Sequence, residues 1–187
     1  MLYGSDGCML PDRPGTYVLI LHLPCPTTIT VGRLGCFHFP AGWYAYAGSA
    51  RGPGGLAARI ARHLRVSKPL RWHVDYLRAH AQPVEVWYTE GHRRQGRQEC
   101  AWAAALSKPP DASIPVPRFG ASDCHCPAHL THFAAPPDLA AFARAVGEPV
   151  SQETVTTQPP SFRATERSAA TEGSRGISCR GHARHRK

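Results

Sequence analysis

Residues 43–47, a Trp-Tyr-Ala-Tyr-Ala run, constrain the fold more than any other segment. Large side chains fall at both odd and even positions, so a strand here needs cover on both faces of its sheet. Residues 17–21 are rich in β-branched and aromatic residues and also predict a strand. Between them, residues 28–31 and 36–39 alternate and predict a long hairpin with the first run. We therefore expect three consecutive antiparallel strands.

Helical patterns occupy much of the rest of the chain. Leu56, Ile60 and Leu64 have helical spacing and predict an amphipathic helix over residues 56–65. We expect further helices at residues 72–77, 94–107 and 138–146, strands at 84–88 and 130–133, and a proline-rich loop at 109–117. The predicted class is α+β, with a small three-stranded antiparallel sheet flanked by helices.

The two ends of the chain differ in composition from its centre. From residue 148 onward Ser, Thr, Pro, Arg and Gly dominate, and few large apolar side chains remain to offset the entropy lost on ordering. We expect a flexible N-terminus over residues 1–12, one domain over 13–147, and a disordered basic tail over 148–187. A basic cluster lies at residues 180–187.

The charge of the chain favours polyanionic partners. Lys and Arg number 22 against 13 Asp and Glu, a formal charge of +9, which makes nucleic acid, and DNA first, the expected partner. No apolar run approaches the roughly 20 residues that cross a bilayer, so no membrane partner is expected. The N-terminal sequence lacks the pattern of a secretory signal, and a cytoplasmic location is the default expectation.

Arg59 and His63 share one flank of the helix predicted over residues 56–65, beside its apolar stripe, at about 100° per residue. Arg62 would point outward from the same helix. A guanidinium at the edge of a packed face can bind a phosphate through two hydrogen bonds. The alternative is an arginine that extends into solvent and an ordinary surface histidine.

Glu99 falls on the most apolar side of the helix predicted over residues 94–107. Trp102, Ala103 and Leu106 follow it at the i+3, i+4 and i+7 positions. Because an unpaired buried charge is costly, the carboxyl must be protonated, paired with an arginine or bound to a cation. A salt bridge and a Mg²⁺ site both stay open, since Mg²⁺ can bind one carboxylate together with waters and phosphate oxygens.

Taken together, the two tyrosine motifs and the candidate residues on the helices resemble the GIY-YIG nuclease superfamily over roughly residues 13–135. The resemblance rests on Gly15-Thr16-Tyr17 and Tyr46-Ala47-Gly48 as the two motifs, followed by Arg59, His63 and Glu99. The chain is more narrowly similar to a little-characterised branch of that superfamily, some of whose members are fused to a base-excision repair glycosylase. Residues 46–50, 55–56, 59–65, 72–77 and 119–126 carry this narrower likeness.

The resemblance implies an endonuclease that hydrolyses phosphodiester bonds in DNA with Mg²⁺ or Mn²⁺, in a DNA repair context. Glu99 would hold the ion, and Tyr17 and Tyr46 would lie side by side on neighbouring strands. We expect Tyr17 as general base and Tyr46 as the group that orients water or metal, although the two roles could be exchanged. A tyrosine pKa near 10 must be lowered for this, and Arg59 and His63 would supply the positive charge. The expected substrate contacts are Gly48, Ser49, Arg62 and His73.

Two features depart from the superfamily pattern. Thr16 and Ala47 stand where its motifs carry isoleucine, and the two tyrosines lie 29 positions apart, farther than is usual in that family. A hairpin that only lengthens the strands would leave the tyrosines aligned, because side chains alternate along a strand. The alternative is that Tyr17 and Tyr46 simply pack within a sheet.

Cys124, Cys126 and His129 are residue types that bind zinc, and their spacing allows three ligands to meet. A second well-spaced pair is missing, so free cysteines and a surface histidine are the competing interpretation. Asp123 borders this segment and is a further candidate for the cleft.

Two other functions remain open at this stage. One is a non-catalytic nucleic-acid-binding module on the same fold, and the other is a zinc-stabilised interaction domain. The presence of Glu99, Arg59 and both tyrosines favours catalysis over the first. The sequence leaves open whether the substrate is DNA or RNA, what structure the substrate has, and which oligomeric state the protein adopts.

Overall fold

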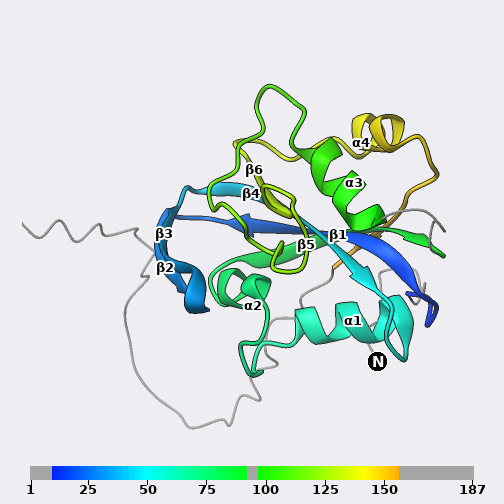
Figure 1. The fold of residues 1–187 in the computed structure, drawn as a ribbon, viewed down its shortest axis with the longest axis horizontal. Coiled ribbons are helices and arrows are strands. Elements are labelled where there is room, and N and C mark those ends of the chain that lie inside the picture. Colours follow the sequence, from blue (N-terminus) through cyan, green and yellow to red (C-terminus); the bar gives the residue numbers. More distant parts are fainter. Residues whose placement is uncertain (1–9, 92–96, 156–187) are drawn as a thin grey trace, which may run out of the picture. The chain divides into compact units, whose positions relative to one another are not determined.

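A five-stranded antiparallel sheet forms the centre of the computed structural model, which describes residues 10–91 and 97–155 (Figure 1). The strand order is β6-β4-β1-β5-β7. The strands are β1 Gly15–Leu23, β4 Gly42–Ala50, β5 Gln82–Glu90, β6 Leu130–Phe133 and β7 Ser151–Thr154. The α+β class is therefore confirmed, but the expected three-stranded sheet is wrong, because β5 pairs with β1 and two short strands extend the edges.

The predicted hairpin forms a separate sheet instead of pairing with β1. Strands β2 (Thr27–Val31) and β3 (Gly35–Phe39) pair with each other around a 3₁₀ turn at Gly32–Leu34. Strand β1 has β4 on one edge and β5 on the other, so no edge remains for β2. The platform of three consecutive strands is wrong for this reason. The hairpin instead packs its buried side chains, Val31 and Phe39 among them, into the core beside α2.

Four helices cover the sheet, two on each face (Figure 1). They are α1 Gly55–Leu64, α2 His73–Arg78, α3 Gln98–Leu106 and α4 Leu139–Val146. Odd-numbered β1 residues such as Leu19 pack with α1 and α2, whereas even-numbered ones such as Val18 pack with α3 and α4. Both faces of β1 are thus buried, which explains its continuous apolar run.

The N-terminus of α1 is capped by backbone from the segment before β1. The N–H of Leu56 donates to the carbonyl of Arg13, and the N–H of Ala57 donates to that of Pro11. These bonds satisfy amides that have no partner within a helix. The expectation of a flexible N-terminus is therefore wrong for residue 11, whereas residues 1–9 lie outside the described part.

The domain ends later than the sequence predicts. Strand β7 pairs residue by residue with β5, from Ser151 opposite Tyr88 to Thr154 opposite Glu85. The predicted tail, residues 148–187, is thus wrong at its beginning. Residues 156–187, with the basic cluster, lie outside the described residues. In the described part of the chain, no helix has the length and apolar character needed to span a bilayer.

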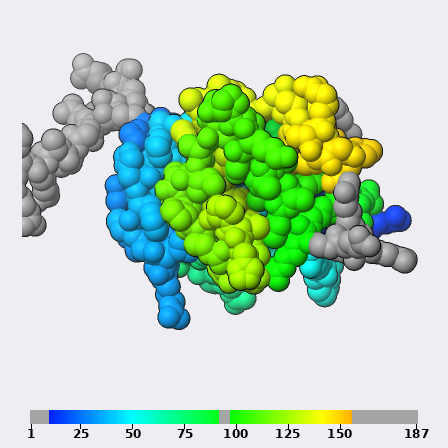
Figure 2. Space-filling model, turned by 45° about the horizontal axis from the view of Figure 1, so that its top comes forward, coloured from blue at the N-terminus to red at the C-terminus, as the bar shows by residue number. Residues whose placement is uncertain are grey.

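The long segment between α3 and β6 lies across one face of the domain. Figure 2 shows this segment, in yellow-green, between the hairpin in blue and α3 in green. Two backbone bonds fix it to the sheet, since the N–H of Ala47 donates to the carbonyl of His129 and the N–H of His129 donates to that of Phe119. Residues far apart in the sequence therefore meet beside the middle of β4, at Tyr46 and Ala47.

Candidate functional site

Tyr17 and Tyr46 lie on neighbouring strands and on the same face of the sheet. In the register of β1 and β4, Tyr17 is opposite Gly48 and Leu19 is opposite Tyr46, so the two tyrosines are diagonal neighbours. The ring of Tyr17 covers Gly48, where a Cβ would come within 2.5 Å of the phenolic oxygen. Glycine at position 48 is therefore what allows the Tyr17 ring to approach β4 this closely.

His63 contacts Tyr17 from beneath the site. Its Nε2 is 2.7 Å from the Tyr17 hydroxyl, and its ring packs against Tyr46 and Trp72. Burial, with the charges of Lys68 and Arg59, lowers the pKa of His63 to about 3. The imidazole is neutral at physiological pH, so the expectation that His63 supplies positive charge to the tyrosines is wrong. Neutral His63 instead shares a hydrogen bond with the Tyr17 hydroxyl through Nε2.

Both tyrosines are held in the protonated form. Burial, and then the neighbouring Tyr46, raise the pKa of Tyr17 far above its usual value, and Arg59 only partly opposes this shift. Burial also raises the pKa of Tyr46 to about 12, again against the effect of Arg59. In the unliganded protein the tyrosines are therefore hydrogen-bonding groups, and a role as base would need additional positive charge.

Arg59 and Arg62 both stack on the indole of Trp72. Their guanidinium carbons lie 4.0 Å and 3.7 Å from the ring centroid. Nε of Arg59 donates to the carbonyl of Ser49 at 3.2 Å. Among the described residues, no carboxylate lies within ion-pair distance of Arg59, so its charge is available to a ligand. Stacking and the Ser49 bond both fix its direction.

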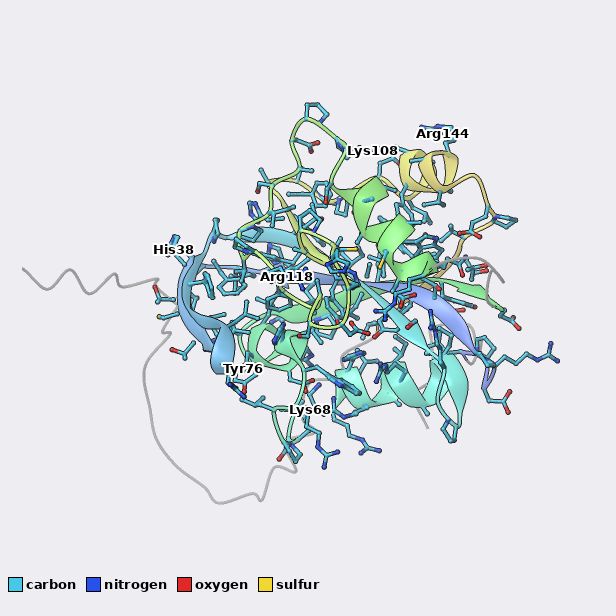
Figure 3. All side chains as sticks on the ribbon, in the orientation of Figure 1. His38, Lys68, Tyr76, Lys108, Arg118 and Arg144 are labelled. Atoms are coloured by element: carbon cyan, nitrogen blue, oxygen red, sulfur yellow. The ribbon has the colours of Figure 1, made fainter. Side chains whose placement is uncertain are left out.

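Arg62 has a different role, because it is bound to the buried carboxylate of Asp75. Its terminal nitrogens lie 3.1–3.2 Å from the Asp75 oxygens, and Lys68 Nζ lies 2.9 Å from Oδ1. Lys68 lies in the connection between α1 and α2 (Figure 3). Two backbone N–H groups, of Arg71 and Trp72, also donate to Asp75. The expectation that Arg62 points outward is therefore wrong, whereas its contact with substrate stays a prediction, since Arg62 also borders the cleft described below.

Burial alone would raise the pKa of Asp75, but its partners outweigh that effect. Hydrogen bonds from Arg62, from the backbone of Trp72 and Arg71 and from Lys68 hold the pKa well below its usual value. The ionised carboxylate ties the C-terminal part of α1 to the start of α2 and holds Trp72 in place beneath the two arginines.

Two adjoining cavities form a cleft at this end of the sheet. One, the tyrosine cavity, measures about 290 Å³, and the other, the arginine cavity, about 410 Å³. Both are bordered by Ser49, Arg59, Trp72, Glu99 and Asp123. The tyrosine cavity adds Tyr17, Tyr46, Gly48, Arg71, His73, Gly120, Ser122 and His129. The arginine cavity adds Arg51, Arg62 and Arg97, among others. Most of the predicted site residues thus share one cleft, whereas His63 lies behind it.

Glu99 is buried at the beginning of α3, with 7% of its surface exposed. Nη2 of Arg51 lies 3.0 Å from Oε2 of Glu99 and 3.3 Å from its Oε1. Of the alternatives open from the sequence, the arginine salt bridge is the one observed. Arg51 was not predicted as a partner, because it lies in the glycine-rich segment before α1 and only the fold brings it near α3.

Asp123 and His73 complete the border of the cleft. Asp123 is exposed and pairs with Arg97 at 2.7 Å. His73 accepts a hydrogen bond at Nδ1 from the N–H of Gly120, at 2.9 Å, and burial lowers its pKa. Nδ1 is thus the unprotonated nitrogen of the neutral ring, and His73 connects α2 to the long segment before β6.

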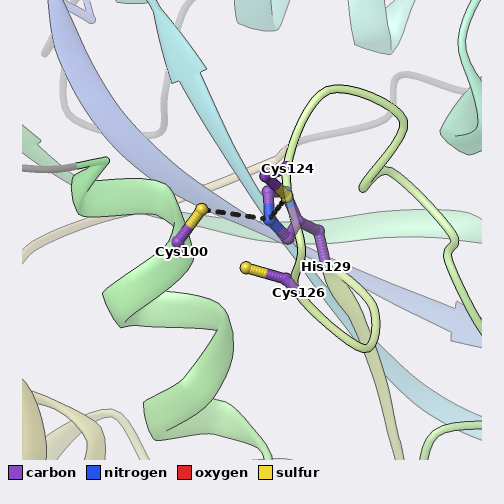
Figure 4. Close-up of side chains that lie close together, drawn as sticks. All are labelled: Cys100, Cys124, Cys126 and His129. Carbon is purple, nitrogen blue, oxygen red and sulfur yellow. Dashed lines mark hydrogen bonds between the residues drawn. The ribbon is translucent and has the colours of Figure 1, made fainter.

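A second group of functional side chains lies beside Glu99. Cys100 on α3 meets Cys124, Cys126 and His129 from the long segment (Figure 4). Their three Sγ atoms and one ring nitrogen all lie within 4.8 Å of one another. His129 is buried, so the alternative of a surface histidine is wrong. Cys100 was not predicted as a member of this group. It lies on the helix that carries Glu99, and no other cysteine or histidine is near it in the sequence.

The thiols of this cluster share a restricted environment. Burial raises the pKa of Cys100, and the neighbouring Cys126 and Cys124 raise it further. Burial also raises the pKa of Cys126. Burial and the neighbouring sulfur atoms thus disfavour the Cys100 thiolate, an effect that a bound cation would oppose.

Comparison with known families places most of the domain in one group. A family model described as "Domain of unknown function DUF123" matches residues 16–151, well over half of the chain. The chain belongs to the DUF123 family. The DUF123 region begins within β1 and ends at the first residue of β7, so it includes both the cleft and the Cys-His cluster. No curated protein and no solved structure gave a match.

Proposed function

We propose that this domain is a divalent-metal-dependent endonuclease that hydrolyses phosphodiester bonds in DNA with a GIY-YIG-type site. One observation carries the proposal: Tyr17, Tyr46, Arg59 and Glu99 line a single cavity of about 290 Å³. They come from four different elements, β1, β4, α1 and α3. Chance packing of a sheet does not require a hydroxyl pair, a guanidinium and a carboxylate to face one space.

The charge of the cleft supports a phosphate-containing substrate. Its border includes Arg51, Arg59, Arg62, Arg71 and Arg97. Arg62 and Arg97 have carboxylate partners, whereas Arg59 is stacked, directed and free to bind an anion. A planar guanidinium held in this way suits two parallel hydrogen bonds to a phosphate. We assign Arg59 the binding of the scissile phosphate.

The oxygen donors of the cleft fit a hard divalent cation. Glu99 and Asp123 border both cavities, and carboxylates with waters are the ligands that Mg²⁺ and Mn²⁺ prefer. Arg51, the observed partner of Glu99, has a half-exposed side chain that can turn into solvent when a cation takes its place. The ion would polarise a phosphate oxygen and lower the pKa of a bound water.

The chain's own hydroxyls are arranged to handle a proton. The Tyr17 hydroxyl shares a hydrogen bond with His63 Nε2, and the phenolic oxygen has a further lone pair that can accept from a water in the cleft. To take a proton from this water, Tyr17 must first be ionised, which requires a lower Tyr17 pKa than the unliganded protein provides. Arg59 already acts in this direction. Tyr46, diagonal to Tyr17, is the second group that orients water.

The alternative, a non-catalytic nucleic-acid-binding module, also has an observation in its favour. Arg51 neutralises Glu99 without any cation, and burial keeps both tyrosines protonated. Such a cleft would bind the phosphate backbone through its arginines and not turn it over. The DNA repair context and the cytoplasmic location stay predictions from the sequence.

One experiment separates these two functions. The full chain is incubated with Mg²⁺ or Mn²⁺ and supercoiled, single-stranded or branched DNA, beside Glu99→Gln. Glu90→Gln is the matched control, since Glu90 lies at the end of β5 in a solvent-exposed pair with Arg13. We expect cutting by the wild type and Glu90→Gln and at least a hundredfold loss in Glu99→Gln, a range typical of a removed catalytic group.

Binding of the same DNA is measured in parallel by fluorescence anisotropy. DNA bound by all three proteins and cut by none would identify the binding module. Equal cutting by the wild type and Glu99→Gln would exclude Glu99 as the metal ligand.

A further inference from the structure

The Cys-His cluster, defined as Cys100, Cys124, Cys126 and His129, has the dimensions of a tetrahedral metal site. Nε2 of His129 lies 3.6 Å from Sγ of Cys100 and 3.4 Å from Sγ of Cys124. A tetrahedral zinc ion, with Zn–S near 2.3 Å and Zn–N near 2.0–2.1 Å, separates its sulfur and nitrogen ligands by about 3.6 Å. The ligand atoms are already at the spacing that one ion would impose.

Hydrogen bonds from the thiols to the lone pair of His129 do not explain this convergence. The unprotonated nitrogen of a neutral imidazole has one lone pair, which accepts one well-aligned hydrogen bond. Two sulfur atoms nevertheless approach the same Nε2, and the third sulfur lies within 4.8 Å of all the others. Figure 4 shows the four side chains directed toward a common centre, Cys100 from α3 and the others from the opposite segment.

We propose that Cys100, Cys124, Cys126 and His129 bind a structural Zn²⁺ ion. On binding, each cysteine loses its thiol proton to solvent and forms a zinc–sulfur bond, while neutral His129 binds through Nε2. Four protein ligands fill a tetrahedral shell, which is the closed arrangement of structural sites. Thiolate ligands select zinc over the hard cations that suit Glu99, so the two metals would not compete.

The backbone around the ligands is fixed in a way that suits a preformed site. His129 is bonded through its carbonyl to Ala47 of β4 and through its N–H to Phe119. Arg118 donates from NH1 to the carbonyl of Cys126 at 2.9 Å, and its backbone has a positive φ of 64°. Figure 3 labels Arg118 in this segment. The turn that carries two of the ligands is therefore held independently of the ion.

The zinc would also hold the carboxylates of the cleft. Cys100 follows Glu99 directly on α3, and Cys124 follows Asp123. A cross-link between these cysteines joins α3 to the long segment on the two sides of the cleft. This consequence for cleavage rests on the proposed nuclease function, whereas zinc binding itself does not.

The metal content of the full chain, purified under reducing conditions without a metal-affinity step, is the first measurement. Elemental analysis should find one zinc per chain in the wild type. Cys126→Ser tests the site, and Cys36→Ser is the matched control, because Cys36 is an exposed free thiol on β3 outside the cluster. We expect Cys36→Ser to retain one zinc and Cys126→Ser to lose at least tenfold in zinc affinity, measured by competition with a chromophoric chelator.

Cobalt substitution gives a readout that does not depend on the stability of a variant. Wild-type protein stripped of metal and loaded with Co²⁺ should show the intense visible bands of a tetrahedral site and the charge-transfer band of cobalt thiolate. Octahedral Co²⁺ spectra, iron in place of zinc, or a zinc content that Cys126→Ser leaves unchanged would each overturn the proposal.

The variant Glu99→Gln tests zinc binding separately from DNA cleavage. If it loses cleavage and keeps one zinc per chain, the two sites are independent. Zinc in a protein that cuts no DNA would support the structural site and reject the nuclease. Cutting by a protein with no zinc and no cobalt signal would reject the structural site alone.

Discussion

The hydroxyl of Tyr17, in the wall of the cleft, lies 2.7 Å from Nε2 of His63 behind it, and the two form a buried neutral pair. His63 is only 1% exposed, and its Nδ1 has no hydrogen-bond partner within residues 10–91 and 97–155. Protonation of His63 would therefore place a charge in a buried position, where the Asp75 carboxylate only partly offsets the cost of burial. The pair explains why this histidine holds the proposed base in one orientation and does not activate it by charge.

The first prediction concerns acid stability. The pKa of His63 is about 3 in the folded protein and near 6.5 in the unfolded chain. Below the unfolded value only the unfolded state takes up this proton, so the free energy of unfolding should fall as pH falls from about 6.5 toward about 3. The limiting slope from one such group is about 1.4 kcal/mol per pH unit. Urea denaturation of the wild type and of His63→Asn at several pH values measures it.

The slope, and not the absolute stability, is the quantity to compare. His63→Asn should have a shallower slope than the wild type, whereas His38→Asn, which changes an exposed histidine on β3, should retain the full slope. Identical slopes in the wild type and His63→Asn would mean that His63 is not held neutral by the fold.

The second prediction tests the close approach between Gly48 and Tyr17. In Gly48→Ala the new Cβ would lie 2.5 Å from the Tyr17 hydroxyl oxygen and 2.6 Å from Cζ, so the ring must move. We expect a destabilisation of about 1–3 kcal/mol, as for other overpacked positions, with loss of any DNA cleavage. Gly52→Ala is the control, because nothing lies within 4 Å of its new Cβ. Equal stability of the two variants would contradict the close contact between Tyr17 and Gly48.

The third prediction concerns the buried charge of Asp75. Asp75→Asn leaves Arg62 and Lys68 beside a neutral amide, and loss of one partner of a buried ion pair typically costs about 3–5 kcal/mol. Chemical denaturation should show this loss. Glu90→Gln, in an exposed pair with Arg13, should change stability by less than about 1 kcal/mol. A small effect of Asp75→Asn would mean that the arginine and lysine find water instead.

The fourth prediction separates charge from shape at Arg59. Arg59→Lys keeps the charge but loses the stacking on Trp72 and the fork of donors. We expect DNA affinity to fall by roughly tenfold at fixed salt concentration, which corresponds to about 1.4 kcal/mol. Arg65→Lys, at the exposed end of the same helix, should bind as the wild type does. Anisotropy titrations with one DNA fragment provide the comparison, and equal affinities would show that Arg59 acts only through its charge.

Periodicity predicted most individual elements but not all of their partners. The helix α1 follows from apolar spacing on one buried face, whereas the strands β1 and β4 follow from short runs of β-branched and aromatic residues that are buried on both faces. Pairing of β1 with β5 depends on edges that come together only in the folded chain. Strand β7, Ser-Gln-Glu-Thr, has no apolar pattern to detect, since backbone pairing at an edge holds it.

The candidate site was predictable where it depended on a helical face or on a motif. Glu99 lies on the buried side of α3, and Tyr17, Tyr46 and Gly48 lie where the motifs indicate. Arg51 and Cys100 were missed because their partners are distant in the sequence, and such contacts leave no local spacing. The wheel placed Arg62 outward because it could not include Asp75, a partner on the next helix.

The register of β1 and β4 makes the distance between the two tyrosines in the sequence uninformative. Leu23 and Gly42 close the ladder, and the hairpin between them projects from that closed end. Insertions or deletions at this point change the count between the motifs without changing which residue faces which. Relatives of this chain should therefore be sought by a tyrosine that faces a glycine across two paired strands, and not by a fixed interval between motifs.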